Sequence, residues 1–538
     1  MVRNCKFQDI LGSLLKKNCA VKANHAGQHS CFFDKKRPFI FEQSPANAGG
    51  SFDALELRTD HRYSTKIQAN HNRGQARCHY RIFYDYSPEN KSKKRSATYP
   101  VINDYDLQED KMTIYVVQSG DTLESIGRYF GISANYLART NDLNLAQPLV
   151  PGQTIVVNLP AVIHTVAGGD TLYSIAARYG TTVTALYQNN PFLMGQPRIV
   201  PGDTIVISFA SPKIGTLAVN GYTYPFIDRD VLRRTLPYLT SMTVFSYGFT
   251  REGNLIEPDD TEIVEIARSY GVAPILLIST LSEEGTFSNE LSSILLNDPA
   301  MQDKLIDQLL EVMEQKNYYA LDIDFEYFYR NEKDLYTAFI QKTTTRMNQN
   351  GYEVIVALAP KTSADQPGLL YEAHDYAAIG AAANRVLLMT YEWGYTYGPP
   401  MAVAPINMVT RVVDYALTVI PSEKIYMGMP NYGYNWALPF VQGESKAQSL
   451  SNVDAVALAA ETSSVIQFDE TAQTPYFTYT ANDSVEHVVW FEDARSVQAK
   501  LNLAHDRSLY GVSWWNIMKY FPQSWLVLNG EYNILKVL

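Results

Sequence analysis

Residues 319–326, with the sequence YALDIDFE, form an apolar segment that carries a carboxylate at every second position. Side chains alternate between the two faces of a β-strand, so Asp322, Asp324 and Glu326 are expected to share one face. Burying three acids together costs several kcal/mol unless they share protons. The last acid is therefore expected to hold a proton near neutral pH, which suits a general acid. A structural ion-pair cluster or a calcium site is the alternative, although an EF-hand would need a turn glycine in a flexible loop.

Apolar segments and helix-like segments alternate along residues 215–538. The apolar segments have the character of strands buried on both faces of a parallel sheet. They lie near 216–224, 241–249, 273–280, 319–326, 353–361, 384–393, 424–433 and 510–517. Eight such units predict an α/β fold of the (β/α)8 or TIM barrel type, whose chemistry lies at the C-terminal ends of the strands. Glu326 would lie at that end of the fourth strand, which favours a catalytic role.

The connection between the seventh and eighth expected strands is too long for a plain loop. It contains strand-like segments at 475–479 and 487–491 and a helix-like segment at 494–504. We predict a small α+β insertion over about residues 436–506 that forms one wall of a cleft.

A tandem repeat precedes the barrel. Residues 115–126 are echoed by residues 164–175, and VPGQTI at 150–155 is echoed by VPGDTI at 200–205. Self-similarity at a fixed offset indicates tandem modules. In each copy a short strand leads into Gly-Asp-Thr, where the polar side chains cap a helix, and Pro-Gly turns the chain into a closing strand. The sequence therefore predicts two βααβ modules, over 112–159 and 162–208.

Residues 1–111 differ from the rest of the chain. They are net basic, whereas the whole chain carries a net charge of −11, and they contain all four cysteines, whose spacing matches no zinc pattern. We expect a poorly structured or non-native extension, with Met112 as a candidate initiator. A basic tract without a fold to present it does not favour nucleic-acid binding. No apolar run of about 20 residues predicts a membrane span, and no ordinary secretory signal is visible.

The repeated residues resemble the LysM module, which binds glycans that contain N-acetylglucosamine. The resemblance implies that the sugar lies between the loop after the first strand and the loop before the last. The implied binding residues are Gly120, Asp121 and Thr122 in the first copy and Gly169, Asp170 and Thr171 in the second. A repeated packing unit without a ligand is the alternative.

The barrel resembles glycoside hydrolase family 18. The family's motifs on the fourth, sixth, seventh and eighth strands match residues 319–326, 389–392, 428–433 and Trp515. Two departures stand out. Tyr319 and Ala320 replace the leading Asp-Gly of the fourth-strand motif, and Glu392 replaces the aspartate of the sixth, so that its side chain reaches one methylene further into the cleft.

The resemblance implies substrate-assisted retention, an exception to the two-carboxylate scheme of glycosidases. Glu326 would protonate the leaving oxygen while the substrate's own acetamido oxygen attacks the anomeric carbon. Asp324 would orient the acetamido group, Asp322 would share a proton with Asp324, and Tyr391 would donate a hydrogen bond to the acetamido oxygen. No metal or cofactor is implied. The expected substrate-binding residues are Trp515, Glu392, Tyr432 and Tyr247. Tyr432 and Tyr247 sit near strand ends, so packing in the core is the alternative for both.

The order of two LysM copies followed by this barrel resembles the bacterial spore-cortex-lytic N-acetylglucosaminidases. The resemblance implies hydrolysis of N-acetylglucosamine linkages in peptidoglycan, in the spore cortex during germination. We expect a monomer associated with the spore coat, the cortex or the cell wall. A chitinase is one alternative. A glycan-binding lectin on an inactive barrel is another, and it is disfavoured because all three acids are present.

Overall fold

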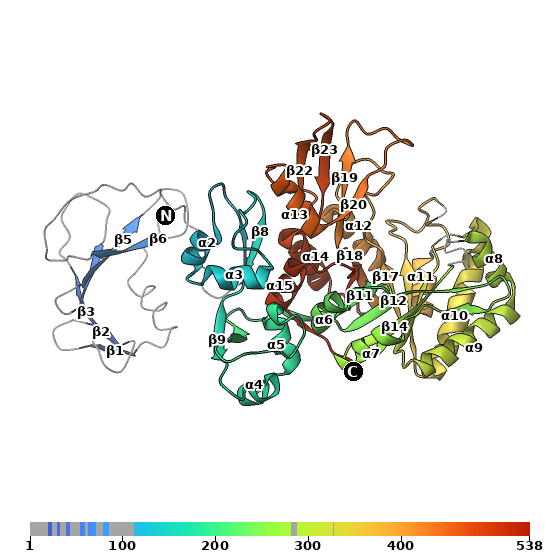
Figure 1. Cartoon of the computed structure of the whole chain (residues 1–538), viewed down its shortest axis with the longest axis horizontal. Coiled ribbons are helices and arrows are strands. Elements are labelled where there is room, and N and C mark those ends of the chain that lie inside the picture. The colour runs from blue at the N-terminus through green and yellow to red at the C-terminus, as the bar shows by residue number, and fades with distance from the viewer. Residues whose placement is uncertain are drawn as a thin grey trace, which may run out of the picture. The chain divides into compact units, whose positions relative to one another are not determined.

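The computed structural model describes most of the chain (Figure 1). Two units are distinguished, Met1–Asp106 and Leu107–Leu538. Among the helices of the described residues, none combines the length and the apolar character that crossing a bilayer requires. The described residues are 112–538 without 281–287, Tyr327 and Leu369, and six strands within the first 111 residues.

The first unit holds an antiparallel sheet whose strands follow each other in chain order. The sequence did not lead us to expect these strands. Otherwise, the prediction that residues 1–111 are poorly structured or non-native falls outside the described residues and stays a prediction. The strands are β1 (Ala20–Ala23), β2 (His29–Phe32), β3 (Phe39–Gln43), β4 (Ala54–Thr59), β5 (Tyr63–Asn70) and β6 (His79–Asp85).

The second unit begins with two βααβ modules, as predicted. In each module the two strands pair antiparallel, and a threonine side chain caps the first helix in a reciprocal capping box. The first module contains β7 (Thr113–Val116), α2 (Leu123–Phe130), α3 (Ala134–Asn141) and β8 (Thr154–Val157). The second contains β9 (Pro160–Thr165), α4 (Leu172–Tyr179), α5 (Val183–Asn189), η1 (Pro191–Leu193) and β10 (Thr204–Phe209).

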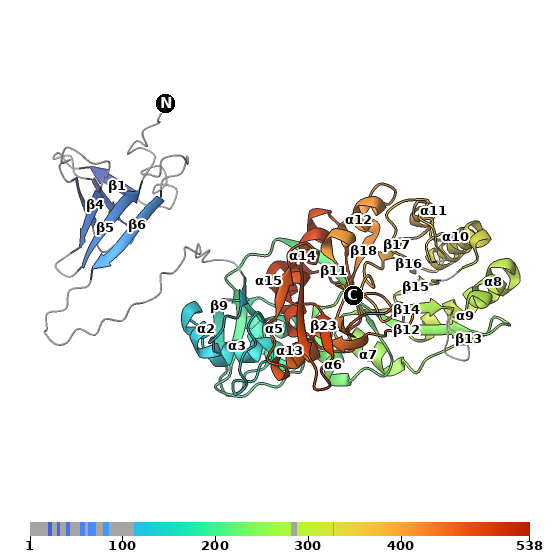
Figure 2. The same cartoon turned by 90° about the horizontal axis from the view of Figure 1, so that it is seen from above.

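Eight parallel strands then close into the predicted barrel (Figure 2). The ring closes because β24 pairs with β11 and β11 pairs with β12. Two short strands, β13 (Leu255–Ile256) and β25 (Tyr532–Ile534), extend the sheet beside β12 and β11. The barrel strands are β11 (Gly215–Thr223), β12 (Ser241–Phe249), β14 (Ala273–Ser279), β15 (Ala320–Asp324), β16 (Glu353–Leu358), β17 (Arg385–Leu388), β18 (Ile425–Pro430) and β24 (Gly511–Trp515).

Helices surround the barrel and bury its outward-facing residues. On β15, Leu321 and Ile323 belong to the large core between strands and helices, whereas Ala320 belongs to a smaller cluster inside the barrel. Asp322 and Asp324 follow Ala320 at two-residue steps and therefore face the interior. The helices are α6 (Arg229–Thr235), η2 (Leu236–Tyr238), α7 (Thr261–Ser269), α8 (Asn289–Asn297), α9 (Pro299–Gln315), η3 (Arg330–Glu332), α10 (Lys333–Gln349), α11 (Tyr376–Ala382), α12 (Ile406–Ala416), η4 (Ser422–Lys424), α14 (Ala494–Asp506) and α15 (Pro522–Glu531).

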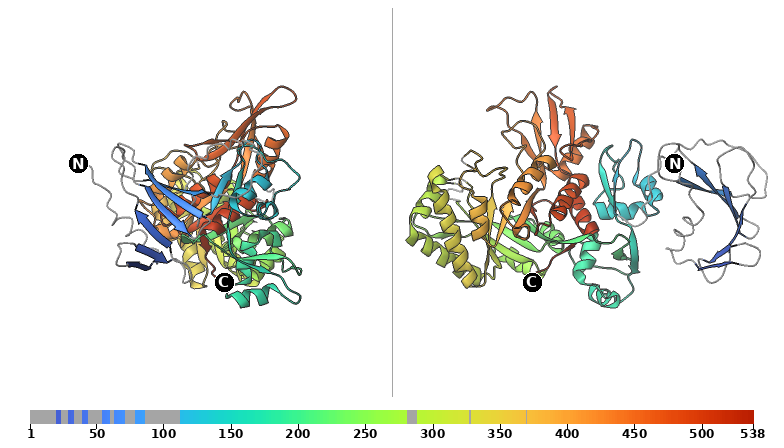
Figure 3. Two further views of the ribbon diagram at one scale, coloured as in Figure 1. Left: turned by 90° about the vertical axis from the view of Figure 1, so that its left-hand side faces the viewer. Right: turned by 180° about the vertical axis from the view of Figure 1, so that it is seen from behind.

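The α+β insertion stands at one end of the barrel (Figure 1; Figure 3, right). Its sheet begins at Tyr432, directly after β18, and so starts slightly before the predicted residue 436. Helix α14, included in the predicted insertion, packs against β18 and β24 of the barrel. The insertion consists of β19 (Tyr432–Ala437), β20 (Gln448–Ser451), α13 (Asn452–Glu461), β21 (Gln467–Asp469), β22 (Thr474–Thr480) and β23 (Glu486–Trp490).

Candidate active site

Two of the three acids lie inside the barrel on β15. Asp322 is fully buried, and its Oδ2 accepts a hydrogen bond from the Tyr222 hydroxyl at 2.5 Å. Burial raises the pKa of Asp322 to about 7, although the Tyr222 hydroxyl and the backbone N–H of Ile323 act in the opposite direction. Asp324 is 5% exposed. Burial, together with the charges of Glu326 and Asp322, raises its pKa well above the usual value.

The inner acids retain unused acceptor atoms. Oδ1 of Asp322 and Oδ1 of Asp324 are both buried, and neither has a hydrogen-bond partner among the described residues. Two carboxylates on one face of a strand cannot both ionise cheaply without water, whereas one proton shared between them lowers this cost. The pair is therefore suited to holding one proton and passing charge between its members.

Glu326 lies two residues beyond the end of β15, at the C-terminal mouth of the barrel. Its side chain is half-buried and keeps contact with solvent. Burial and the neighbouring charge of Glu392 raise the pKa of Glu326. A carboxyl group with these properties can donate a proton near neutral pH. The role of Glu326 as general acid stays a prediction.

Tyr391 and Glu392 follow β17 and face the same mouth. Burial and the charges of Asp324 and Glu326 raise the pKa of Tyr391. Glu392 has a backbone φ of 66°, a conformation that non-glycine residues adopt mainly where surrounding contacts impose it. Its carboxylate accepts hydrogen bonds from the hydroxyls of Tyr432 and Tyr434.

Trp515 ends β24 and sits among aromatic rings. Its ring centroid lies 5.1 Å from that of Phe245 and 5.5 Å from that of Tyr222, in edge-on geometry. These contacts fix the indole, which stays half-buried at the barrel mouth. Beside it opens a cavity of about 390 Å³ lined by Glu392, Asn431, Tyr432, Tyr434, Ser449, Leu450, Ser451, Asp454, Trp515, Asn516 and Lys519. The insertion therefore contributes one wall of the cleft.

The chain matches known families over its modules and over the barrel. Residues 262–519 match glycosyl hydrolases family 18, and residues 115–158 and 164–208 match the LysM domain. The cortical fragment-lytic enzyme of Bacillus subtilis (strain 168) is 43% identical over 431 residues, which cover 79% of this chain and 99% of that protein. The chain belongs to glycosyl hydrolase family 18. It is a glycoside hydrolase that carries two LysM domains.

Solved structures agree with this assignment. The Bacillus cereus spore cortex-lytic enzyme SleL superposes with a TM-score of 0.68 at 36% identity, covering 79% of this chain and 99% of that one. A chitinase from Chromobacterium violaceum superposes with a TM-score of 0.55 at 24% identity, covering 59% of this chain and 99% of that one. The second likeness shows the fold alone.

The interpretation of Tyr247 as a substrate-binding residue of this family 18 site is wrong. Tyr247 is 0% exposed and belongs to the core between the barrel and its helices. Its hydroxyl donates a hydrogen bond to Asp260 Oδ2 at 2.6 Å and accepts one from Lys316 Nζ at 3.0 Å. A tyrosine near a strand end can line the cleft or pack in the core, and the sequence does not show in which direction its side chain points.

In the first LysM module the predicted binding residues shape the loop after β7. Asp121 Oδ2 accepts hydrogen bonds from the Tyr115 hydroxyl at 2.7 Å and from the Gln118 N–H at 2.8 Å. Gly120 has φ of 89°, which side chains beyond glycine rarely tolerate. Thr122 caps α2. These side chains hold the loop in place, and their direct contact with a glycan stays a prediction.

The second module repeats this arrangement. Asp170 Oδ2 accepts a hydrogen bond from the Ala167 N–H and contacts His164 Nε2, both at 2.8 Å. Gly169 also has φ of 89°, and Thr171 caps α4. The loop therefore has the same internal scaffold in both modules.

Sequence reasoning missed Tyr222. Its hydroxyl is the hydrogen-bond donor to Asp322, and its ring packs against Trp515. Alternation along the first strand, which places Ala218 and Tyr222 on the interior face, was the available signal. Asn431 and Lys519 of the cleft were also missed, because both lie in connections rather than in strand motifs.

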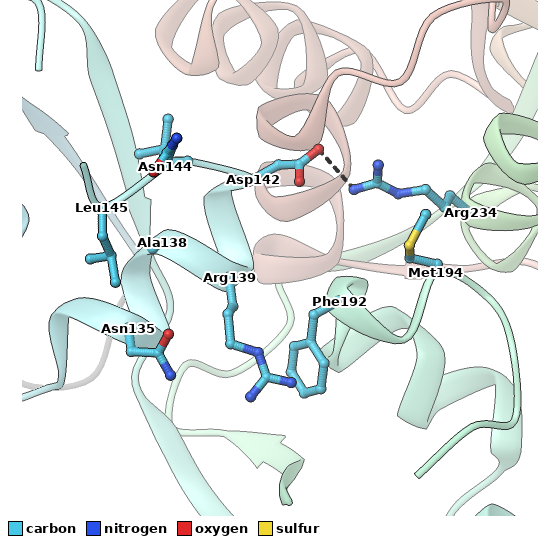
Figure 4. A pocket seen from close by; sticks show the side chains of 10 residues that line it. Asn135, Ala138, Arg139, Asp142, Asn144, Leu145, Phe192, Met194 and Arg234 are labelled. Atoms are coloured by element: carbon cyan, nitrogen blue, oxygen red, sulfur yellow. Dashed lines mark hydrogen bonds and ion pairs between the residues drawn. The ribbon is translucent and has the colours of Figure 1, made fainter. Parts of the chain in front are cut away.

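A second hollow, of about 380 Å³, lies where the two LysM modules meet the barrel (Figure 4). Asp142 of the first module pairs with Arg234 of α6 at 2.9 Å. The Arg139 guanidinium lies 3.8 Å from the ring centroid of Phe192 in the second module. Asp142 and Arg234 pair with each other and Arg139 stacks on Phe192, so the hollow marks a joint between the three parts.

Proposed function

We propose that this chain is a retaining β-N-acetylglucosaminidase that uses substrate assistance to hydrolyse peptidoglycan of the spore cortex. The observation that carries the proposal is the trio of Asp322 and Asp324 inside the barrel and Glu326 at its mouth, with all three pKa values raised. Relatives that are over 40% identical along 99% of their own length are named for cortex fragments, which supports this substrate over chitin.

In the proposed mechanism the proton starts on Glu326. It passes to the glycosidic oxygen as the bond to the anomeric carbon breaks, and the acetamido oxygen of the same sugar attacks that carbon. Asp324 orients the acetamido N–H and balances the positive charge on the resulting oxazolinium ring, while the Tyr391 hydroxyl bonds the acetamido oxygen. Glu326, now a carboxylate, then takes a proton from water, which opens the ring with net retention.

The two inner acids keep this cycle electrically balanced. Asp322 accepts a hydrogen bond from Tyr222 and has a pKa of about 7. It can therefore share the proton of Asp324 while Asp324 contacts the acetamido group of the sugar. Trp515 forms the apolar floor under the sugar ring, where stacking contributes about 1 kcal/mol beyond burial. We further infer that the protein acts as a monomer and works at the spore cortex or cell wall, the second point resting on relatives named for cortex fragments.

Replacing Glu326 with glutamine tests the proposal. We expect Glu326→Gln to lose at least about a hundredfold in kcat, because the amide cannot donate the proton, while the protein folds and still binds glycan. Release of reducing ends from cortex muropeptides, with products identified by mass spectrometry, is the measurement. Undiminished release by the variant would reject the assignment.

A parallel incubation with chitin oligomers separates the two substrates. The proposal requires a higher kcat/KM on cortex fragments than on chitin oligomers of equal length. The reverse order would make the protein a chitinase on the same chemistry.

A further inference from the structure

The two LysM modules share a sequence motif but differ in exposure at the loop before their closing strands. Val150 and Val200 occupy equivalent positions in the repeated Val-Pro-Gly turn. Val150 is 5% exposed, whereas Val200 is 62% exposed. This loop forms one side of the region where a glycan is expected, so the modules are unequal at the place that matters for binding.

The insertion covers the loop of the first module. The N–H of Ile466 in the insertion donates a hydrogen bond to Pro151 O at 2.9 Å. Arg495 of the barrel helix α14 donates another to Gly152 O at 3.4 Å. Val150 belongs to an apolar cluster of the insertion. The buried members of that cluster are Val150, Ala455, Ala459, Ile466, Phe477, Val489 and Phe491.

The closing strand of the first module is fixed as well. Thr154 donates a hydrogen bond from its hydroxyl to Gln523 Oε1 at 2.5 Å, and Gln523 returns one from Nε2 to Thr154 O at 2.9 Å. Both groups are buried. Strand β8 is therefore tied to α15 of the barrel while the preceding loop is tied to the insertion.

The second module docks onto the barrel through different contacts. Gly195 O accepts a hydrogen bond from the Tyr270 hydroxyl at 2.7 Å, and Gln188 donates one to Pro237 O at 2.8 Å. Its Val-Pro-Gly turn remains open, because a Cβ added at Gly202 would meet no atom within 4 Å. The loop at residues 167–169 is also exposed. Both loops of this module are therefore accessible to a glycan.

We propose that the modules divide the work: the second module binds the glycan strand, and the first is a bracket that fixes the insertion against the barrel. This inference rests on the proposed function for the identity of the glycan. The bracket bears on catalysis because the insertion carries Ser449, Ser451 and Asp454, which line the cleft. A fixed insertion holds that wall of the cleft at one distance from Trp515.

A matched pair of substitutions tests which module binds. Ser119 and Gly168 are equivalent and exposed in the loops after the first strands, so an arginine at either position leaves the packed core untouched. The probe is the soluble β-1,4 pentamer of N-acetylglucosamine, titrated calorimetrically into Glu326→Gln protein. We expect two sites in the parent, the cleft and the second module. Gly168→Arg should lose one site or weaken it at least tenfold, and Ser119→Arg should change neither affinity by more than twofold.

Three sites in the parent, or equal losses in the two variants, would overturn the division. So would an unchanged titration with Gly168→Arg. None of these outcomes concerns hydrolysis, so failure of the inference is distinguishable from failure of the proposed function, which is measured by release from cortex fragments.

A second pair tests the bracket. Gly152 and Gly202 have φ of 86° and 98°, so alanine strains the backbone similarly at both. Only at Gly152 would the new Cβ meet a backbone atom, Ile466 O, at 1.9 Å. We expect Gly152→Ala to raise KM at least threefold on a chromogenic N-acetylglucosamine disaccharide that is too short to reach the modules, and to lower the Tm more than Gly202→Ala does. Equal KM and Tm values for the two variants would refute the bracket.

Discussion

At the scale of single residues, the proposed site contains carboxyl groups whose pKa values burial raises. Asp322 is an example, because its pKa of about 7 lies about three units above the value in an unfolded chain. Between about pH 4 and pH 7 the folded protein keeps a proton that the unfolded chain releases. The stability linked to Asp322 is therefore present below pH 4 and is lost as the pH rises through 7.

Asp322→Asn removes this titration and keeps an oxygen that can accept the Tyr222 hydrogen bond. The free energy of unfolding of the variant minus that of the parent should increase as the pH rises from 4 to 8, because only the parent loses the stability linked to Asp322. The full span is about 4 kcal/mol if Asp322 titrates alone. Urea unfolding at a series of pH values is the measurement. A pH-independent difference between variant and parent would contradict the shifted pKa.

At the scale of elements, the periodicity of the sequence sufficed for the strands but not for the loops that extend from their C-terminal ends. The fourth strand was expected at 319–326 and spans Ala320–Asp324, and the sixth was expected at 384–393 and ends at Leu388. Tyr391 and Glu392 therefore lie in a loop whose shape depends on contacts from β19, including the hydroxyls of Tyr432 and Tyr434. Alternation along a strand carries no information about such a loop.

One contact between elements positions Glu326, the proposed proton donor. His374, just before α11, is fully buried, and its Nδ1 accepts a hydrogen bond from the Ala359 N–H at 2.7 Å. Because a backbone N–H can only donate, the ring proton must lie on Nε2, which donates to Phe325 O at 3.1 Å. Burial lowers the pKa of His374 to about 4, so the ring stays neutral in the working range. The carbonyl it holds belongs to the peptide that leads into Glu326.

Two amide substitutions separate the two hydrogen bonds of His374. His374→Gln can place its NH₂ near the Nε2 position and keep the bond to Phe325, whereas His374→Asn can keep the bond to Ala359 and lose the other. We expect His374→Asn to lower kcat about tenfold with little change in KM, and His374→Gln to lower it less. Steady-state kinetics with circular dichroism as a control for folding would check this. A larger loss in the glutamine variant would show that His374 does not act through the peptide before Glu326.

At the scale of the whole molecule, the sequence predicted the parts and missed their contacts. Both LysM modules and the barrel follow from local repeats and periodicities, which need no knowledge of distant residues. Val150 and Val200 stand in the same motif, yet one is buried and the other exposed because Ile466, more than 300 residues away, covers only the first. The prediction for Tyr247 was wrong because it, too, depended on contacts with other elements. The Tyr247 hydroxyl is hydrogen-bonded to Asp260 and Lys316, which hold the side chain in the core.

These contacts predict how residues 112–538 unfold. The first module shares an apolar cluster with the insertion and a buried hydrogen-bonded pair with α15, and the second is bonded to the barrel through Gln188 and Gly195. Surfaces that are buried together lose their stabilisation together, so a chain beginning at Met112 should show one calorimetric transition whose van't Hoff and calorimetric enthalpies agree. Gly152→Ala should broaden that transition on its low-temperature side or produce a separate transition at lower temperature, because it loosens the contact between the first module and the insertion. Two resolved transitions in the unsubstituted chain would mean that the modules are tethered to the barrel and not packed on it.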